Sequence, residues 1–379
     1  MKRLLQPFIV TVTAILALGY VYLAVRLSSN VWQRVGLALP FILVWLVPVV
    51  YWGGNRDRER ALDHVLHQAS YLCMAWLSFL LVLTLGRDVA LLLTMWSPSL
   101  APVHDLFEQA GVLMVFAGSL AAMVIGALAA LRGPRLKQVD VTIDGLHRDL
   151  DGFRIAQISD LHVGPTIRTR YVERVVQMTC ALEPDVIALT GDIVDGPVER
   201  LSGYVAPLQR LAAAKGTYFV LGNHDCYAGA AAWTAHFKAM GMNVLLNTHA
   251  TVSRGAARIH IGGVLDPAVR LTYPGSEPRA DLAAHGGQTA SFRLLLAHNP
   301  KIAPLAQRAG FDLQLSGHTH AGQFFPWTLA VRLVHAPHVA GLSREGPMWV
   351  YVSAGTGTWG PPVRFGTEPE LTLIRLVRG

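Results

Sequence analysis

The stretch "YFVLGNHDCY", Tyr218–Tyr227, joins an apolar run directly to a group of polar side chains. The run is rich in aromatic and β-branched residues, which is typical of a buried β-strand. It stops at Gly222, and an amide, an imidazole and a carboxylate follow at Asn223, His224 and Asp225. A buried strand that ends in three such side chains indicates that its end enters a functional crevice.

The same kind of strand end occurs twice earlier in the chain. One apolar run ends in "SDLHVG", which contains Asp160 and His162, and another ends in "TGDIVDG", which contains Asp192. The steps from Asp160 to Asp192 and from Asp192 to Asn223 are 32 and 31 residues, about one βαβ unit each. Because the carboxyl ends of parallel strands share one edge of a sheet, where ligands bind in open α/β sheets, these side chains are expected to meet.

From about Gln138 onward, short apolar runs alternate with helical patterns, which predicts an α/β domain with largely parallel sheets. Runs without an intervening helix, such as 258–264 and the last two, predict a partly antiparallel sheet. The segment 267–288 is expected to be a long loop, mobile over the site. The expected strands are 153–159, 185–190, 217–221, 243–246, 258–264, 292–298, 312–316, 349–354 and 371–377, and the expected helices are 169–183, 201–214 and 230–240.

Two later strand ends add imidazoles to the same edge: "LLAHNP" contains His298, and "SGHTH" contains His318 and His320. Asp160 and His162 are two residues apart, as are His318 and His320. Each pair would face one side if the backbone stays extended there.

The resulting pool holds two carboxylates, one amide oxygen and four imidazoles. Mixed oxygen and nitrogen ligands suit Mn, Fe or Zn better than Ca or Mg. Seven ligands are too many for one ion, and they fit two divalent ions if one carboxylate bridges. The candidate ligands are Asp160, His162, Asp192, Asn223, His298, His318 and His320.

The motifs "SDLH", "GDIVD", "GNHD", "AHNP" and "GHTH", in this order, resemble the calcineurin-like metallophosphoesterase superfamily over about residues 150–379. The tail "SAGTGTWGPPVRFG" resembles a bacterial membrane-associated branch that includes UDP-diacylglucosamine-type pyrophosphohydrolases and other phosphodiesterases. The resemblance implies a four-layer α/β/β/α sandwich of mixed sheets, in a catalytic domain of residues 138–379.

The resemblance also implies a role for each site residue. A hydroxide held by two metals would be the nucleophile, and His224 would contact the phosphate and help the leaving oxygen depart. Asp225 would orient His224. The implied ligands are Asp160, His162, Asp192 and His320 for one metal, and Asp192, Asn223, His298 and His318 for the other, with Asp192 bridging.

Other polar residues near these motifs have two interpretations each. Asp195 is either a helix cap or a hydrogen-bond partner of a ligand. Arg364 either binds a substrate phosphate or pairs with Glu368 or Glu370. His335 is expected in a loop with no metal role. The glycine-rich "GTGTWG" (355–360) is expected to be a metal-site or substrate loop rather than a dinucleotide fingerprint, because it follows no first βα turn.

The first third of the chain has the composition of a membrane region. The whole chain is 52% hydrophobic and 15% charged, with a mean hydropathy of +0.37. About 20 apolar residues span a ~30 Å hydrocarbon core. An all-α transmembrane region of about four helices is therefore expected over residues 1–137. The four apolar segments are Pro7–Val25, Val35–Trp52, Ala69–Leu85 and Gly111–Leu131.

Two alternatives to four spans are a signal peptide over the first segment and a water-soluble helical bundle. Segments that are apolar all round argue against the bundle. After the third segment, Arg87 is expected to mark the membrane edge, and "VALLLTMW" a short interfacial or re-entrant piece.

Loop charges predict the orientation of these spans. Lys and Arg are concentrated before the first segment, in the second loop and after the fourth segment, whereas the third loop, "SPSLAPVHDLFEQ", has none. Positive loops face the cytoplasm. Both termini and the catalytic domain are therefore expected on the cytoplasmic side of the cell membrane. The second-loop cations are Arg56, Arg58 and Arg60.

The net charge of +7 fits loop cations that face anionic lipid. Because the chain has no basic run interleaved with aromatics, no nucleic-acid partner is expected. Three scattered cysteines form neither a disulfide framework nor a paired zinc motif, which suits a reducing compartment.

These patterns together predict a membrane-anchored dimetal phosphohydrolase that cleaves a phosphodiester or pyrophosphate bond, on a lipid-linked substrate. One alternative is a nucleotide phosphodiesterase or nuclease that the spans merely localise. A second is a receptor or transport subunit whose metal-binding domain does not turn over. The intact ligand set argues against the second, as do the few polar residues in the spans.

Overall fold

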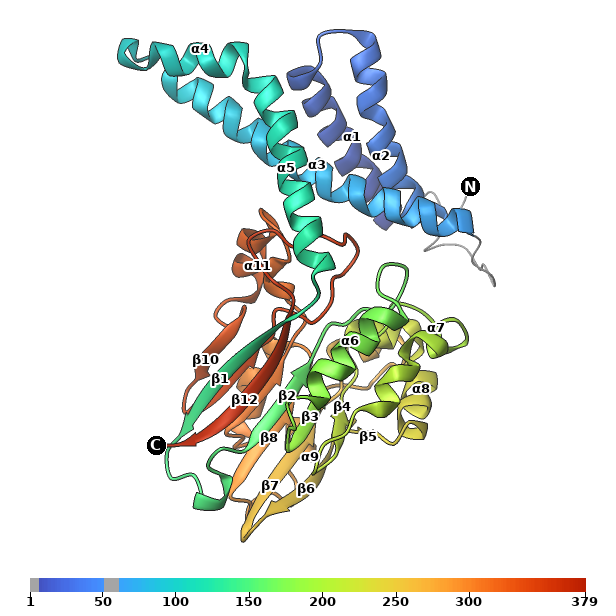
Figure 1. The fold of residues 1–379 in the computed structure, drawn as a ribbon, viewed down its shortest axis with the longest axis vertical. Coiled ribbons are helices and arrows are strands. Elements are labelled where there is room, and N and C mark those ends of the chain that lie inside the picture. Colours follow the sequence, from blue (N-terminus) through green and yellow to red (C-terminus); the bar gives the residue numbers. More distant parts are fainter. Residues whose placement is uncertain (1–6, 51–60) are drawn as a thin grey trace. The chain divides into compact units, whose positions relative to one another are not determined.

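The computed structural model describes residues 7–50 and 61–379, and the chain divides into two compact units (Figure 1). The helical unit contains Met1–Leu131 and Gly360–Phe365, and the α/β unit contains Arg132–Trp359 and Gly366–Gly379. The domain boundary expected between residues 137 and 138 stays a prediction. The first strand, β1, already begins at Arg135.

The described part of the helical unit holds long apolar helices. Three stretches have the length and composition to cross a membrane: Ile9–Leu27, Val65–Thr94 and Gly111–Leu131. The described apolar stretch of the second helix, Val31–Leu46, is shorter. The number of spans stays a prediction, since Trp52, Arg56, Arg58 and Arg60 lie outside the described residues. The helices are α1 (Pro7–Leu27), α2 (Val31–Val50), α3 (Ala61–Thr94), α4 (Ala101–Gln109) and α5 (Gly111–Leu131).

The expectation of a separate piece after Arg87 is wrong, because α3 runs unbroken past it to Thr94. The stretch contains no proline that would break the helix. The adjacent Asp88 is neutralised within the unit: Arg26 donates two hydrogen bonds to its carboxylate (2.6 and 2.7 Å), and the Tyr22 hydroxyl donates a third (2.8 Å). The Asp88 carboxylate inside a long helix is therefore compatible with an apolar setting, because Arg26 matches its charge.

The α/β unit contains two six-stranded sheets, both of mixed direction. The first has the order β1-β12-β2-β3-β4-β5, and the second has the order β10-β11-β9-β8-β7-β6. Strands β2 to β5 are parallel, as are β7, β8, β9 and β11, whereas β12 runs antiparallel to β2. The strands are β1 (Arg135–Ile143), β2 (Arg154–Ile158), β3 (Val186–Leu189), β4 (Thr217–Phe219), β5 (Asn243–Val244), β6 (Thr248–Arg254), β7 (Ala257–Gly263), β8 (Phe292–Leu296), β9 (Leu313–Ser316), β10 (Gly341–Glu345), β11 (Met348–Val352) and β12 (Glu370–Arg378).

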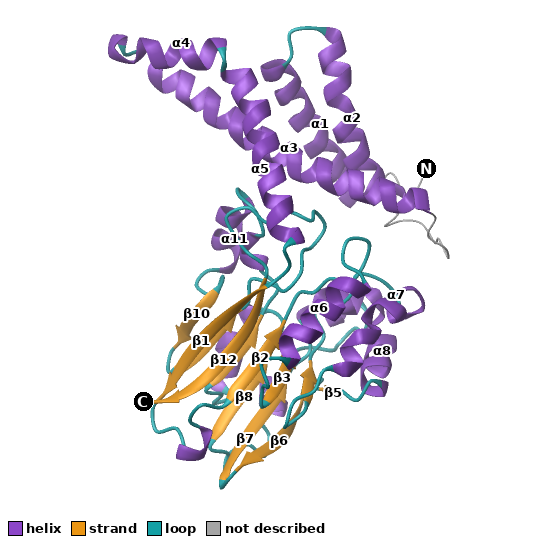
Figure 2. Cartoon of the chain, viewed as in Figure 1, coloured by secondary structure: helices purple, strands orange, loops and turns teal. Residues whose placement is uncertain are grey.

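The α/β unit has four layers, because helices cover the outer face of each of its two sheets (Figure 2), and apolar cores lie between the layers. One core lies between the sheets and includes Ile155, Ile261 and Leu294. A second core joins the first sheet to its covering helices and includes Trp233, and a third joins the second sheet to α9 and α10 and includes Phe311. The expected mixed α/β fold is therefore confirmed. The helices are α6 (Thr169–Cys180), α7 (Val198–Val205), α8 (Asn223–Ala239), α9 (Ala280–Ala283) and α10 (Ala303–Arg308).

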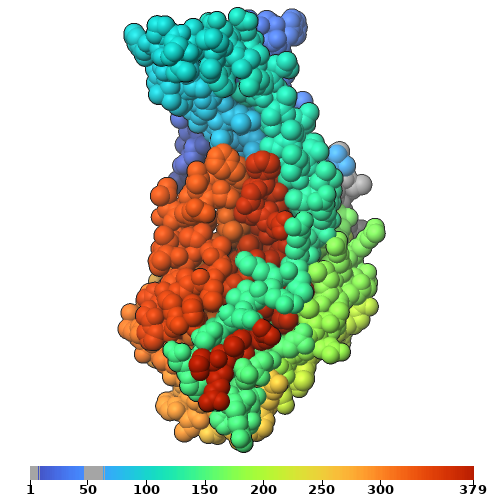
Figure 3. Space-filling model, turned by 60° about the vertical axis from the view of Figure 1, so that its left-hand side comes forward, coloured from blue at the N-terminus to red at the C-terminus, as the bar shows by residue number. Residues whose placement is uncertain are grey.

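Three edge strands and three helices of the α/β unit were not expected from the sequence: β1, β6 and β10, and α9, α10 and α11 (Trp327–His335). Six of the nine residues of β1 are exposed, and β6 has the polar sequence "THATVSR". Edge strands need no continuous apolar run, because one side of them meets solvent. Strand β1 instead pairs along its whole length with β12, and both are visible on the surface in Figure 3. The segment 267–288 holds two short helices, Pro267–Leu271 and α9.

We predict that Leu294→Ala lowers the free energy of unfolding by about 2–5 kcal/mol, because Leu294 is fully buried between the sheets and its truncation leaves a cavity. Leu282→Ala on α9 is the control, since Leu282 is 48% exposed. Urea titration of the detergent-solubilised full-length protein, followed by circular dichroism, measures both. Equal shifts for the two variants would contradict the position of the inter-sheet core.

Candidate metal centre

The predicted polar residues all follow the carboxyl ends of strands. Strand β2 ends at Ile158, β3 at Leu189 and β4 at Phe219 in the first sheet, and β8 ends at Leu296 and β9 at Ser316 in the second. Ligand-bearing turns from both sheets therefore open toward one region. Helix α8 begins at the candidate ligand Asn223 itself, seven residues earlier than expected.

The backbone around the candidate ligands is not extended, so the condition for residues two apart to face one side is not met. Asp160 and His162 still join one set of donors, whereas His318 and His320 do not. Asp160, His162 and Asp192 each have φ of 52°, and His318 and His320 have φ of 73° and 50°. Positive φ is uncommon for residues other than glycine, and it costs free energy that the surrounding structure must offset. With this left-handed geometry, the direction of a side chain does not follow from the spacing of two residues along the chain.

Three sets of donors lie close together at this edge. Two of them share no residue and are described first, and the third, His162, Asp192 and His224, overlaps both. In the first donor group, the ligand atoms of Asp160, His162 and His320 lie within 4.8 Å of one another. The second donor group, Asp192, His298 and His318, satisfies the same criterion.

Asn223 adds an oxygen to the second donor group, and Asp192 connects the two groups. The side-chain oxygen of Asn223 lies 2.9 Å from His318 Nδ1 and 3.2 Å from His298 Nε2, which adds it to the second donor group. The Asp192 Oδ2 atom lies 3.1 Å from His298 Nε2 and 3.8 Å from His162 Nε2. This one oxygen therefore lies between the two groups.

The chemistry of the donors fits divalent cations. His162 Nε2 lies 2.9 Å from His320 Nε2, and His298 Nε2 lies 3.3 Å from His318 Nδ1. Such paired imidazole nitrogens can share only one proton, whereas a cation can accept the lone pairs of both. Burial of Asp160 and Asp192 next to each other also calls for nearby positive charge.

Hydrogen bonds behind the donors fix their orientation. His298 Nδ1 donates to the backbone carbonyl of Thr190 (2.8 Å), so its Nε2 lone pair faces the donor group. The Asp160 carboxylate accepts from the Ser159 hydroxyl (2.6 Å) and from the backbone N–H of His318 (2.9 Å). Contacts of this kind behind metal ligands set the tautomer and hold the ligand in place.

Asp195, rather than Asp225, orients the histidine of the "GNHD" motif. Its Oδ1 atom accepts hydrogen bonds from His224 Nδ1 (2.9 Å) and from His162 Nδ1 (2.7 Å). One carboxylate therefore sets the orientation of a candidate ligand and of the candidate catalytic histidine. The sequence signal was the position of Asp195 three residues after Asp192, and it allowed either this role or a helix cap.

Asp225 faces the backbone instead, which corrects the role expected for it. Its carboxylate accepts four N–H groups: those of Gly222 (2.8 Å), Asp192 (2.8 Å), Ile193 (2.9 Å) and Val194 (3.1 Å). Because Asp225 is in the first turn of α8, its side chain points back to the residue that caps the helix. It therefore joins two strand-end turns and does not touch His224.

Burial sets the protonation of several site groups. Burial and the charge of Asp192 raise the pKa of Asp225 to about 7, against the hydrogen bonds that it accepts. Burial also tends to raise the pKa of Asp195, but the charge and hydrogen bond of His162 outweigh it and lower the pKa to about 2. Burial lowers the pKa of His318 to about 3, which keeps its ring neutral and able to bind a cation.

The glycine-rich segment 355–360 lies against the first donor group. Its Thr356 N–H donates to the carbonyl of Ser159 (2.7 Å), and its Gly357 N–H donates to the carbonyl of Asp160 (3.0 Å). Trp359, which the sequence did not single out, places its ring 5.7 Å from that of His224. An aromatic residue within a glycine-rich turn was the available signal.

Arg364 is buried in the helical unit, where its backbone N–H donates to a carbonyl of α5 (2.8 Å), and both of its expected roles stay predictions. Glu368 and Glu370 form ion pairs with Arg135 (2.6 Å) and Lys137 (3.2 Å). His335 lies on α11 rather than in a loop, and its ring is 5.3 Å from that of His318.

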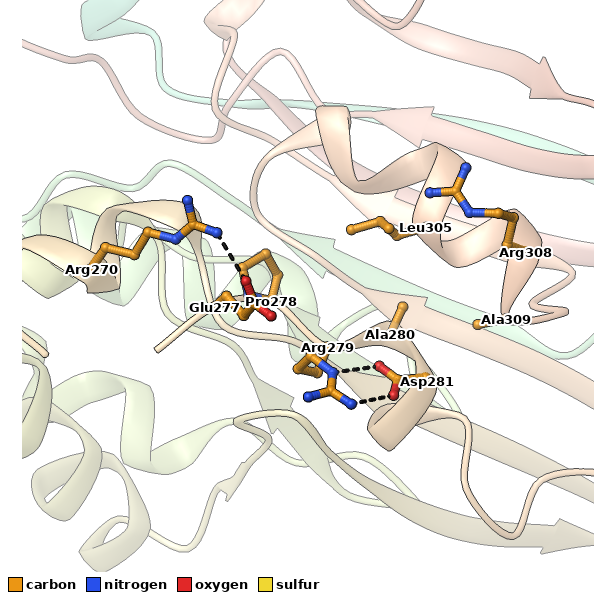
Figure 4. Close-up of a pocket in the computed structure, with 9 residues that line it drawn as sticks. All are labelled: Arg270, Glu277, Pro278, Arg279, Ala280, Asp281, Leu305, Arg308 and Ala309. Atoms are coloured by element: carbon orange, nitrogen blue, oxygen red, sulfur yellow. Dashed lines mark hydrogen bonds and ion pairs between the residues drawn. The ribbon is translucent and has the colours of Figure 1, made fainter. Parts of the chain in front are cut away.

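A separate cavity of about 460 Å³ lies between the segment that ends in α9 and helix α10 (Figure 4). Two of its arginines are neutralised by neighbours: Arg270 pairs with Glu277 (3.1 Å), and Arg279 pairs with Asp281 (2.6 Å). None of the seven candidate ligands, all within the described residues, lines it. It is therefore distinct from the candidate metal centre.

Comparison with known proteins agrees with this geometry. The model of the calcineurin-like phosphoesterase family matches residues 153–322. A transmembrane protein with metallophosphoesterase domain from Danio rerio is 35% identical over 82% of this chain and 78% of its own length. One from Bos taurus is 37% identical over 67% of this chain, which spans only 59% of that relative. A metallophosphoesterase from Helicobacter pylori strain J99 is 34% identical over 66% of each chain.

The chain belongs to the calcineurin-like metallophosphoesterase family, and its α/β unit is a phosphoester hydrolase domain. The named relatives and the apolar helices agree with a transmembrane protein. The finer assignment to a bacterial pyrophosphohydrolase-like branch stays a prediction.

We predict that Asp225→Ala lowers the free energy of unfolding by about 3–5 kcal/mol, because it leaves four backbone N–H groups without their acceptor. Asp195→Ala is the matched control, since Asp195 is partly exposed and accepts only from side chains. Its stability should fall less, by about 1–3 kcal/mol, since one buried donor, His162 Nδ1, loses its acceptor instead of four. Thermal unfolding of both purified variants measures the two effects. If Asp195→Ala is as unstable as Asp225→Ala, the greater structural importance of Asp225 is refuted.

Proposed function

We propose that the α/β unit holds two divalent cations and hydrolyses a phosphodiester or pyrophosphate bond in a lipid-linked substrate. The observation that carries this proposal is the position of Asp192 Oδ2 between His162 and His298. An oxygen shared by two donor groups suits a bridging carboxylate. Two metal ions about 3.5–4 Å apart are the usual arrangement for phosphoryl-transfer enzymes of this type.

The donor groups suggest how the ligands are divided. Asp160, His162 and His320 would hold one cation, and Asn223, His298 and His318 would hold the other, with Asp192 shared. The mixture of imidazole nitrogen with carboxylate and amide oxygen favours Mn, Fe or Zn. When bound, such cations would polarise a phosphoryl oxygen and lower the pKa of water toward about 7.

His224 supplies the chain's own proton chemistry. Asp195 accepts from its Nδ1 atom, which leaves the Nε2 atom to meet the substrate, and in the protonated ring Nε2 carries the proton that passes to the leaving oxygen. The side chain is 22% exposed, so a substrate can reach it. Proton donation to a departing alkoxide or phosphate offsets the charge that develops as the bond breaks, and it contributes about 10²–10⁴-fold in rate.

The membrane region supports a lipid-linked substrate. A catalytic unit attached to apolar, membrane-length helices meets amphiphilic molecules at high local concentration. We place the protein in the cell membrane as a multi-pass protein with the catalytic unit on the cytoplasmic side, on the strength of the loop charges.

We predict that His224→Gln lowers kcat for bis-p-nitrophenyl phosphate with Mn²⁺ by about 10²–10⁴-fold and leaves the bound metal unchanged, because His224 handles a proton rather than a cation. Asp192→Ala should abolish both turnover and metal binding. Elemental analysis of the purified variants accompanies the kinetics. Turnover that survives Asp192→Ala would remove the case for the shared carboxylate.

The substrate class needs a direct comparison. We predict that a lipid pyrophosphate or phosphodiester presented in vesicles is hydrolysed with a higher kcat/KM than cyclic nucleotides or DNA, because the spans hold the site at a bilayer. Measuring all of them with one protein preparation tests this. A preference for nucleotides or DNA would instead support a nucleotide phosphodiesterase or nuclease.

Reporter fusions test the proposed orientation. A reporter that is active only in the cytoplasm, fused after Gly379, should be active, because the positively charged segments flank the termini. A reporter that is active only outside the cytoplasm should be silent at the same position and active in the loop 97–109. The reverse pattern would overturn the orientation.

A further inference from the structure

Helix α11 exposes its apolar side. None of its nine residues, all of them described, is buried. Leu333 is 89% exposed and Val334 is 60% exposed, and Leu329 and Trp327 are each about half exposed. Single exposed leucines are ordinary, but a continuous apolar helix face of this kind marks a contact surface.

The helix is oriented opposite to an ordinary surface helix. Its polar residues Thr328 and His335 are half-buried together with Val331. Leu329 and Leu333 are exposed, and Arg332 is the one charged residue beside them. A helix on a water-soluble domain buries its apolar stripe and exposes its polar one. Because the exposed side of α11 is mainly apolar and its half-buried side carries polar residues, the medium outside the helix is expected to be apolar.

The connections of the chain favour lipid as that medium. Helix α5, a membrane-length apolar helix, ends at Leu131, and β1 begins four residues later. Residues Gly360–Phe365 belong to the helical unit. Gln323, four residues before α11, is hydrogen-bonded to Trp359 (2.8 and 3.0 Å) and accepts from the Thr367 hydroxyl, so it holds the residues on both sides of that segment.

We propose that α11 lies in the bilayer interface, with Leu329, Leu333 and Val334 among the acyl chains. Its composition suits that position: Trp327 is of the residue type that occupies membrane–water interfaces, and Arg332 can extend its charge to the headgroups. The contact between the rings of His335 and His318 then puts one side of the candidate metal centre at headgroup level. The inference concerns a membrane contact of the α/β unit and does not depend on turnover.

The test labels single cysteines with the fluorophore bimane in the full-length protein, reconstituted in phosphatidylcholine–phosphatidylglycerol vesicles. The background carries Cys73→Ala, Cys180→Ala and Cys226→Ala. Leu333→Cys reports on α11. Leu271→Cys is the matched control, because Leu271 is 76% exposed in the same unit and lies outside α11. The quenchers are a phospholipid with a nitroxide in its upper acyl chain and aqueous iodide.

The label at residue 333 should be quenched several-fold more by the nitroxide lipid than the label at residue 271, and it should be the less sensitive of the two to iodide. A label at residue 333 that responds to iodide as the control does, and not to the lipid, would overturn the proposal. Protection from both quenchers would overturn it as well, since that result means that a protein or a second copy of the chain covers the helix.

Discussion

The four backbone N–H groups that converge on the Asp225 carboxylate are the contact on which the metal centre depends. One belongs to Gly222, after β4, and three belong to the successive residues 192–194, after β3. A buried N–H without an acceptor costs about 1–3 kcal/mol, so this carboxylate holds two strand-end turns in one arrangement. The arrangement in turn positions Asp192, whose Oδ1 atom accepts from the backbone of His224 (2.8 Å). The shared oxygen and the candidate catalytic histidine are therefore placed by the same contact.

Close packing of the turns explains why the motifs carry glycine beside the donors. A Cβ atom on Gly222 would meet the carboxylate and backbone nitrogen of Asp192, and one on Gly317 would meet the side chains of Ser159 and Asp160. The donors themselves then adopt positive φ, which is a strained conformation for residues with a side chain. The strain is tolerated because each turn is held on both sides, by the sheets and by the hydrogen bonds behind the ligands.

The convergence of these residues could be predicted from the sequence because strand ends of parallel sheets share an edge. Five strand ends carry polar residues, and the first three are one βαβ unit apart, which leaves few other arrangements. Side-chain direction could not be predicted, since the positive φ of His318 and His320 separates residues that an extended chain would place together. The role of Asp225 could not be predicted from its position next to His224. In the first turn of α8, its carboxylate points back to the N–H of Gly222, the residue that caps the helix. Edge strands such as β6 were missed because they carry no apolar run.

The electrostatics of the centre link cation binding to the stability of the fold. Asp160 and Asp192 are both buried, and burial together with the charge of Asp192 raises the pKa of Asp160. In two pairs of histidines, His162 with His320 and His298 with His318, a nitrogen of one ring lies within hydrogen-bond distance of a nitrogen of the other. Divalent cations held by these donors, as we propose, would satisfy the carboxylates and the lone pairs at once, so their binding should favour the folded state by mass action. The strand-end turns therefore affect both cation binding and stability. Their side chains would repel one another without cations, and the same side chains would bind the cations.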